Sequence, residues 1–112
     1  MRAVHLRRRM VLETPERAAD GAGGFVETWR ALGEVWAEVT ALQGREAAGA
    51  GVALSRSGHR IVLRGAPVGS SMRPRPDQRL REGERVFHIL AVTERDPEGR
   101  YLTCVTQEEV AR

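Results

Sequence analysis

The sequence contains three histidines and one cysteine, the side chains most often used for metal binding or nucleophilic catalysis. His5, His59 and His88 are far apart along the chain, and none of them stands in an H-x-H or H-E-x-x-H pattern. Cys104 faces the same way as Leu102 in an alternating segment, which is typical of a small buried apolar residue. The sequence therefore predicts no metal site, no cofactor and no enzymatic activity, and we interpret His59 and His88 as core or interface residues.

Arginine supplies all of the positive side-chain charge, since the lysine and arginine total of 18 contains no lysine. Guanidinium groups bind carboxylates and phosphates through paired hydrogen bonds. The strongest basic cluster lies between residues 72 and 81 and consists of Arg73, Arg75, Arg79 and Arg81. No aromatic residue is interleaved there to stack on bases. The cluster therefore predicts contact with the DNA backbone or with an acidic protein surface, without base readout.

A second basic run, Arg7 to Arg9, lies near the N-terminus. Its simpler interpretation is a solvated edge or N-terminal segment, and its sharper one is contact with an acidic partner or with phosphate. The formal net charge of +3 is small for a dedicated DNA-binding protein. Both interpretations stay open.

Length and composition set the class of protein. A chain of 112 residues, 41% hydrophobic and 29% charged, fits one globular domain over residues 1–112. The single cysteine excludes an intrachain disulfide, and we expect a cytosolic protein. No apolar run approaches the roughly 20 residues that cross a bilayer, and the N-terminus lacks a secretory apolar region, so no membrane association is expected.

The first half of the chain predicts a hairpin. Residues 4–13 alternate as a strand, with Leu6, Met10 and Leu12 on one face. Residues 14–24 contain a proline, an aspartate and three glycines, so we expect a loop there, and strand residues resume at 25–29. Together these segments predict a long hairpin arm.

Residues 32–42 fit two interpretations. Leu32, Val35, Trp36, Val39 and Leu42 form a helical stripe, while alternate residues from 35 to 41 form one face of a strand. The glycine at 33 and the β-branched residues favour the strand. Residues 43–57, rich in small side chains, predict a flexible excursion with at most a short helix at 45–48.

The second half of the chain predicts several short strands. Residues 59–64 alternate cleanly, with His59, Ile61 and Leu63 inward and Arg60, Val62 and Arg64 outward. The proline-rich loop at 65–77 is long, and such loops are commonly functional. Short strands are expected at 79–81, 85–93 and 101–106, with turns at 82–84 and 96–99. We therefore predict a mainly β chain, a small antiparallel SH3-like barrel or a sandwich, with long loops and at most one short helix.

The order of these features has a counterpart in a known family. After the basic first strand and the glycine turn, the corresponding residues are Glu27, Thr28 and Trp29; Val35 to Val39; Leu42 to Glu46; His59, Ile61 and Arg64; Arg85, Phe87, Ile89 and Val92; and Arg100, Leu102 and Glu108. In this order the chain resembles the head-tail joining proteins of tailed phages, also called head closure or stopper proteins, and their relatives in gene transfer agents. The resemblance spans nearly the whole chain.

The resemblance implies a structural subunit of the particle neck that is assembled in the bacterial host cytoplasm. Such a β-barrel would form a homo-oligomeric ring below the portal and adaptor, retain packaged double-stranded DNA, and present a surface to the tail terminator or tail tube. Under this hypothesis Arg73 and Arg75 contact DNA or an acidic adaptor surface. Arg7, Arg9, Arg45 and Glu46 are expected at a subunit or ring interface.

Two alternatives stay open at the level of the sequence. The chain could instead be an adaptor or tail-completion subunit of the same neck. The second alternative belongs to a different class of protein. The arginines alone would also suit an SH3-like or OB-like nucleic-acid-binding barrel that is not part of a particle, whose affinity for nucleic acid should fall strongly with salt.

Overall fold

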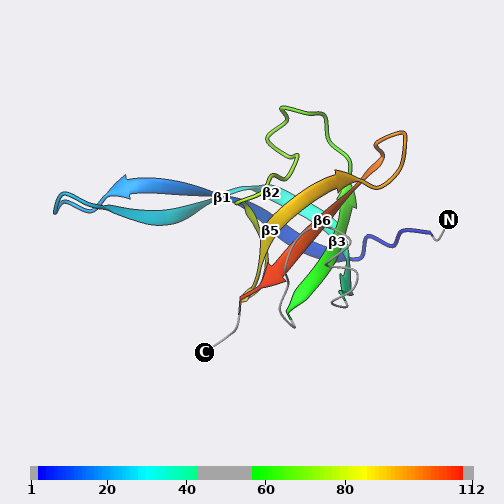
Figure 1. Ribbon diagram of the computed structural model, residues 1–112, viewed down its shortest axis with the longest axis horizontal. Coiled ribbons are helices and arrows are strands. Elements are labelled where there is room, and N and C mark those ends of the chain that lie inside the picture. The colour runs from blue at the N-terminus through cyan, green and yellow to red at the C-terminus, as the bar shows by residue number, and fades with distance from the viewer. Residues whose placement is uncertain (1–2, 43–56, 110–112) are drawn as a thin grey trace.

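The computed structural model describes residues 3–42 and 57–109, which form six strands and no helix. The strands are β1 (Arg8–Ala19), β2 (Phe25–Ala41), β3 (Gly58–Arg64), β4 (Arg79–Glu82), β5 (Arg85–Glu94) and β6 (Tyr101–Glu108). All pair antiparallel in the order β1-β2-β3-β6-β5-β4, and β4 returns to β1 (Figure 1). The predicted mainly β fold is confirmed, and the closed barrel is the form adopted. In this part of the chain no helix is long and apolar enough to cross a membrane.

Strands β1 and β2 continue past the barrel as a two-stranded arm, residues 14–30 (Figure 1). Pairing between β1 and β4 ends at Glu13, so beyond it β1 has only β2 as a partner. The molecule is correspondingly elongated, measuring 53 × 30 × 25 Å. At the tip, Asp20 Oδ1 accepts hydrogen bonds from the backbone N–H of Ala22 (2.8 Å) and of Gly24 (3.0 Å), which closes the turn.

The predicted hairpin arm is confirmed, but the loop predicted at 14–24 is wrong over its first half. Strand β1 runs through Pro15, which lies opposite Trp29, and ends only at Ala19. A proline cannot donate to a sheet ladder, yet it is tolerated where one side of the strand has no neighbour. The first strand also begins at Arg8 rather than at residue 4.

A β-bulge marks the junction of barrel and arm. The register between β1 and β2 shifts at Leu12/Glu13, because Leu12 pairs with Gly33 while Glu13 pairs with Ala31. Such a bulge bends the strand and increases its twist, which directs the arm away from the barrel. The strand interpretation of residues 32–41 is therefore confirmed, and the bulge explains why its alternation is imperfect at residue 32.

The barrel interior is filled by apolar side chains from all six strands: Met10, Leu12, Ala37, Ile61, Leu63, Leu80, Phe87, Ile89 and Cys104. The inward faces predicted for Ile61, Leu63 and Cys104 are confirmed. Val62, predicted to point outward, is also buried. Strand β3 lies between β2 and β6, so the Val62 side chain is flanked on both sides by its register partners Glu38 and Thr103.

The remaining short strands agree with the sequence to within one or two residues, and β4, β5 and β6 pair as a continuous ladder. The turn after β5 is held by Asp96, whose carboxylate accepts the backbone N–H groups of Arg100 (3.2 Å) and Tyr101 (3.0 Å). Apart from Ser57, the predicted excursion at 43–57 and the short helix within it lie outside the described residues.

Candidate functional site

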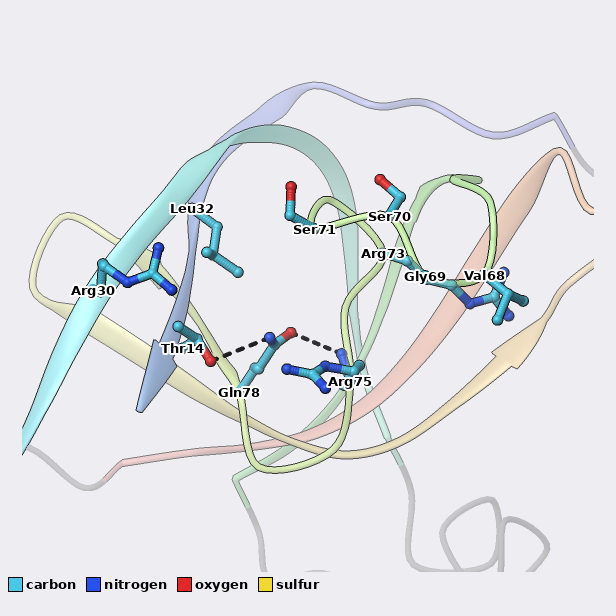
Figure 2. A pocket seen from close by; sticks show the side chains of 10 residues that line it. All are labelled: Thr14, Arg30, Leu32, Val68, Gly69, Ser70, Ser71, Arg73, Arg75 and Gln78. Carbon is cyan, nitrogen blue, oxygen red and sulfur yellow. Dashed lines mark hydrogen bonds between the residues drawn. The ribbon is translucent and has the colours of Figure 1, made fainter. Parts of the chain in front are cut away.

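The loop between β3 and β4, residues 65–78, folds against the base of the arm and encloses a pocket of about 380 Å³ (Figure 2). We call it the arginine pocket. Its lining comes from both elements: Thr14, Arg30, Leu32, Val68, Gly69, Ser70, Ser71, Arg73, Arg75 and Gln78. The loop that the sequence marked as functional therefore borders one of the main concavities of the molecule.

Gln78 fixes the floor of the arginine pocket. Its side chain is buried, with Oε1 accepting the backbone N–H of Arg75 (2.9 Å) and Nε2 donating to Thr14 Oγ1 (3.4 Å) (Figure 2). Its backbone carbonyl accepts the N–H of Ile89 at 2.9 Å. The loop is thus tied to both the arm and β5, and the pocket is held open by these bonds.

Three arginines line the arginine pocket, and they differ in whether their guanidinium groups already have partners within the chain. Arg30 is paired with Glu16 across the arm, Nε to Oε1 at 2.6 Å. Arg73 donates from Nη1 to the carbonyl oxygen of Ala66 (3.0 Å), which braces the loop. Arg75 is exposed, and among the described residues its guanidinium has no hydrogen-bonded or ion-paired partner. Of the three pocket arginines, Arg75 is therefore the one most available to a phosphate or carboxylate.

Arg79 and Arg81, predicted to belong to the same cluster, form ion pairs within the chain. Their Nε atoms donate to the two carboxylate oxygens of Glu13, at 2.7 Å and 3.0 Å. Burial acts to raise the pKa of Glu13, but these two hydrogen bonds outweigh it and leave the pKa below its ordinary value. The three residues join β1 to β4 where the barrel closes, and we call them the seam.

The seam extends to the base of the arm. The Arg79 guanidinium lies 4.2 Å from the ring centroid of Trp29, and that ring meets His88 edge-on at 5.9 Å. A guanidinium over an indole face is attracted by the ring quadrupole. The four-arginine cluster is therefore divided, with Arg73 and Arg75 on the pocket and Arg79 and Arg81 in the seam.

The residues expected at a subunit interface lie on the surface where they are described. Arg7 is exposed, and Arg9 pairs with Glu34 at 3.2 Å, both side chains being largely exposed. Arg45 and Glu46 lie outside the described residues. These contacts leave the interface role of all four residues a prediction.

The candidate catalytic groups are dispersed. The His59 ring packs edge-on against Phe87, with centroids 5.3 Å apart, and His88 Nε2 lies 2.6 Å from a carboxylate oxygen of Glu109. Burial raises the pKa of the Cys104 thiol to about 12, which suppresses the thiolate needed for nucleophilic attack. Within residues 3–42 and 57–109 no three metal-ligating side chains gather into a site.

Sequence reasoning missed Glu13 and the arm residues of the arginine pocket, Thr14 and Arg30. Glu13 carried one local signal, a carboxylate at the end of an alternating apolar strand. No local signal existed for Thr14 or Arg30, because their partners in the pocket come from a loop more than thirty residues away in the sequence.

Comparison with known proteins gives concordant results. A family model described as phage head completion protein matches residues 1–109. The chain is 57% identical to a chain in the virion of a native gene transfer agent particle, covering 96% of this chain and 98% of that one with a TM-score of 0.74. A protein of Shigella flexneri 2a, solved in solution, has a TM-score of 0.74 at 23% identity with full coverage of both chains, which shows the fold alone. No curated protein sequence matches the chain.

Proposed function

Because the chain belongs to the phage head completion protein family, we propose that it is a head closure, or stopper, subunit of the neck of a phage or gene transfer agent particle. It forms a ring between the portal-adaptor complex and the tail, retains packaged DNA and provides the surface on which the tail docks. The observation that carries this proposal is the family match over residues 1–109, supported by the 57% identity to a chain of a gene transfer agent virion.

The physical character of the chain supports a role based on shape and charge. The barrel core is closed and apolar, the thiol is buried, and the side chains of His59 and His88 contact an aromatic ring and a carboxylate respectively. The surface carries a projecting two-stranded arm and a braced loop with arginines, which are features that bind other proteins or a phosphate backbone. We assign the chain no catalytic step.

Within this function we assign Arg73 and Arg75 to contact with DNA or with an acidic surface of the adaptor ring. Arg75 supports this assignment best because its guanidinium is exposed beside the arginine pocket. The free nucleic-acid-binding barrel is less well supported, since Glu13 neutralises part of the charge of Arg79 and Arg81. Two of the four arginines in the strongest basic cluster are therefore engaged within the chain.

The first experiment locates the chain and removes it. Electron cryomicroscopy of purified particles should place the barrel in the neck between portal and tail. Particles made without it should accumulate as tailless heads that lose their DNA to added nuclease. A position in the adaptor ring or at the tail end would replace this assignment with the adaptor or tail-completion alternative, and absence from the particle would overturn it.

The second experiment tests the arginine pocket. Arg75→Glu should lower the yield of DNA-filled, tailed particles, and Arg75→Lys, which keeps the charge, is the matched control. Adding Arg73→Glu should deepen the defect. If the charge-reversed chain is incorporated and both DNA retention and tail attachment are unchanged, the arginine pocket has no role in the neck.

A further inference from the structure

The tip of the arm carries an apolar surface on both faces. Phe25 and Val26 are 62% and 48% exposed. They follow one another along β2 and so point to opposite faces, and their cross-strand partners are Ala19 and Ala18. These four residues, which we call the knob, have no core behind them, because the arm is only two strands wide. An exposed phenylalanine and an exposed valine at the end of a projecting arm are available for contact with another molecule.

A second exposed apolar surface lies on the barrel. A groove of about 390 Å³ runs between β2, the start of the 65–78 loop and the segment before β1, and Leu6, Val35, Trp36 and Met72 provide its apolar lining. Trp36 is 53% exposed. Tryptophan and methionine are enriched in protein interfaces, and tryptophan is also enriched at their energetic centres. We call this concavity the Trp36 groove.

The knob of a given copy is held away from its own groove. Phe25 and Trp36 lie on the same strand, and eleven residues of extended chain separate them by about 36 Å. The arm is paired along its length and projects from the barrel (Figure 1). Any knob that enters the Trp36 groove therefore belongs to another molecule.

The charges around the two surfaces are complementary. The knob is flanked by the carboxylates of Asp20 and Glu27, both exposed, and by Arg17, whose guanidinium lies 4.5 Å from the centroid of the Phe25 ring, so acidic groups exceed basic ones there by one. At the groove, Glu34 is neutralised by Arg9 at 3.2 Å, whereas Arg64 is exposed and has no ion-pair partner among the described residues.

From this match we propose that the knob of one copy docks into the Trp36 groove of the next, with Glu27 beside Arg64. The proposal rests on the ring-forming function above and names the surfaces that join the subunits. Each copy supplies one knob and one groove, so the contact is head-to-tail. Repeated contacts of this kind close into a ring when the rotation per copy divides a full turn.

Cross-linking tests the docking directly. Ala22→Cys places a thiol at the tip of the arm and Ala66→Cys places one on the groove wall, while the native Cys104 is buried with its pKa raised to about 12. A short bismaleimide should link the double variant into a ladder of oligomers, both in particles and in the purified chain at rising concentration. A mixture of the two single variants should stop at dimers, and Ala22→Cys alone should give none.

A charge exchange tests the orientation. Arg64→Glu and Glu27→Arg should each lower the cross-linking yield roughly tenfold, and their combination should restore it, because the pair is re-formed with its signs reversed. Leu90→Ala, which removes an exposed apolar side chain outside both surfaces, is the control and should leave the yield unchanged.

Three outcomes would overturn the docking: Ala22→Cys linking to itself, a charge exchange that fails to restore the yield, or the absence of cross-links in both settings. If particles hold the chain in the neck without cross-links, the docking is wrong and the neck function stands. If the purified chain cross-links but is missing from the neck, the docking stands and the neck function is wrong.

Discussion

Replacing Glu13 by glutamine should destabilise the barrel at its seam. The Glu13 side chain is 7% exposed and accepts one charge-assisted hydrogen bond from each of Arg79 and Arg81. Removing one partner of a buried pair costs about 3–5 kcal/mol, since the other charge is left uncompensated. Here Arg81 remains 38% exposed and glutamine still accepts one bond, so we expect a loss of about 2–4 kcal/mol. That is a large part of the roughly 5–15 kcal/mol available to a small domain.

Equilibrium urea unfolding measures this loss as a lower midpoint with an unchanged slope. Glu34→Gln is the matched control, because Glu34 also pairs with an arginine but both side chains are about 60% exposed or more, and such pairs contribute about 0–1 kcal/mol. A Glu13→Gln variant that loses no more than the Glu34→Gln variant would refute the argument that burial gives the seam its strength.

Three further predictions concern pH, the thiol and a close backbone contact. Hydrogen bonds from arginines lower the pKa values of Glu82 and Glu108. Burial acts to raise the pKa of Glu13, but its interactions with Arg79 and Arg81 outweigh burial, so this pKa is lowered as well. The stability that these ionised carboxylates add is present above the ordinary carboxyl pKa of 4.5 and is lost as the pH falls through their lower folded-state pKa values. The urea midpoint should therefore drop between about pH 5 and about pH 3, and drop less in Glu13→Gln. Cys104 should resist a thiol-reactive dye in the native protein and react once urea unfolds it, as absorbance would record. Gly65→Ala should cost about 1–3 kcal/mol in the same unfolding assay, because the new methyl group would overlap the backbone of the turn before β6.

Much of the fold could be predicted because local sequence patterns determine it. Alternation at 59–64, glycines at the arm tip and the turn at 96–99 each report on neighbouring residues, and the structure has a strand, a hairpin tip and a turn at these places, although Val62 is buried. The errors arose where context outweighed the local signal. Pro15 reads as a loop residue, but it is accommodated in β1 because that stretch has a neighbour on one side only.

The candidate site was predicted less completely for the same reason. Spacing along the chain grouped four arginines, whereas the barrel brings Glu13 to two of them across a separation of 66 residues or more. The residues next to Arg79 in the sequence therefore give no signal that Glu13 is its partner. The acid therefore could not be assigned to its partners before the closing of β1 on β4 was known.

The arm has a consequence for how the chain behaves at high concentration. A closed barrel leaves no strand with an unpaired ladder, but each margin of the arm exposes main-chain N–H and C=O groups that could recruit a further strand and begin fibre growth. Pro15 removes one of the donors, and Glu16, Arg17, Glu27 and Arg30 place charge along both margins. These residues of the arm thus oppose uncontrolled stacking of one chain upon another.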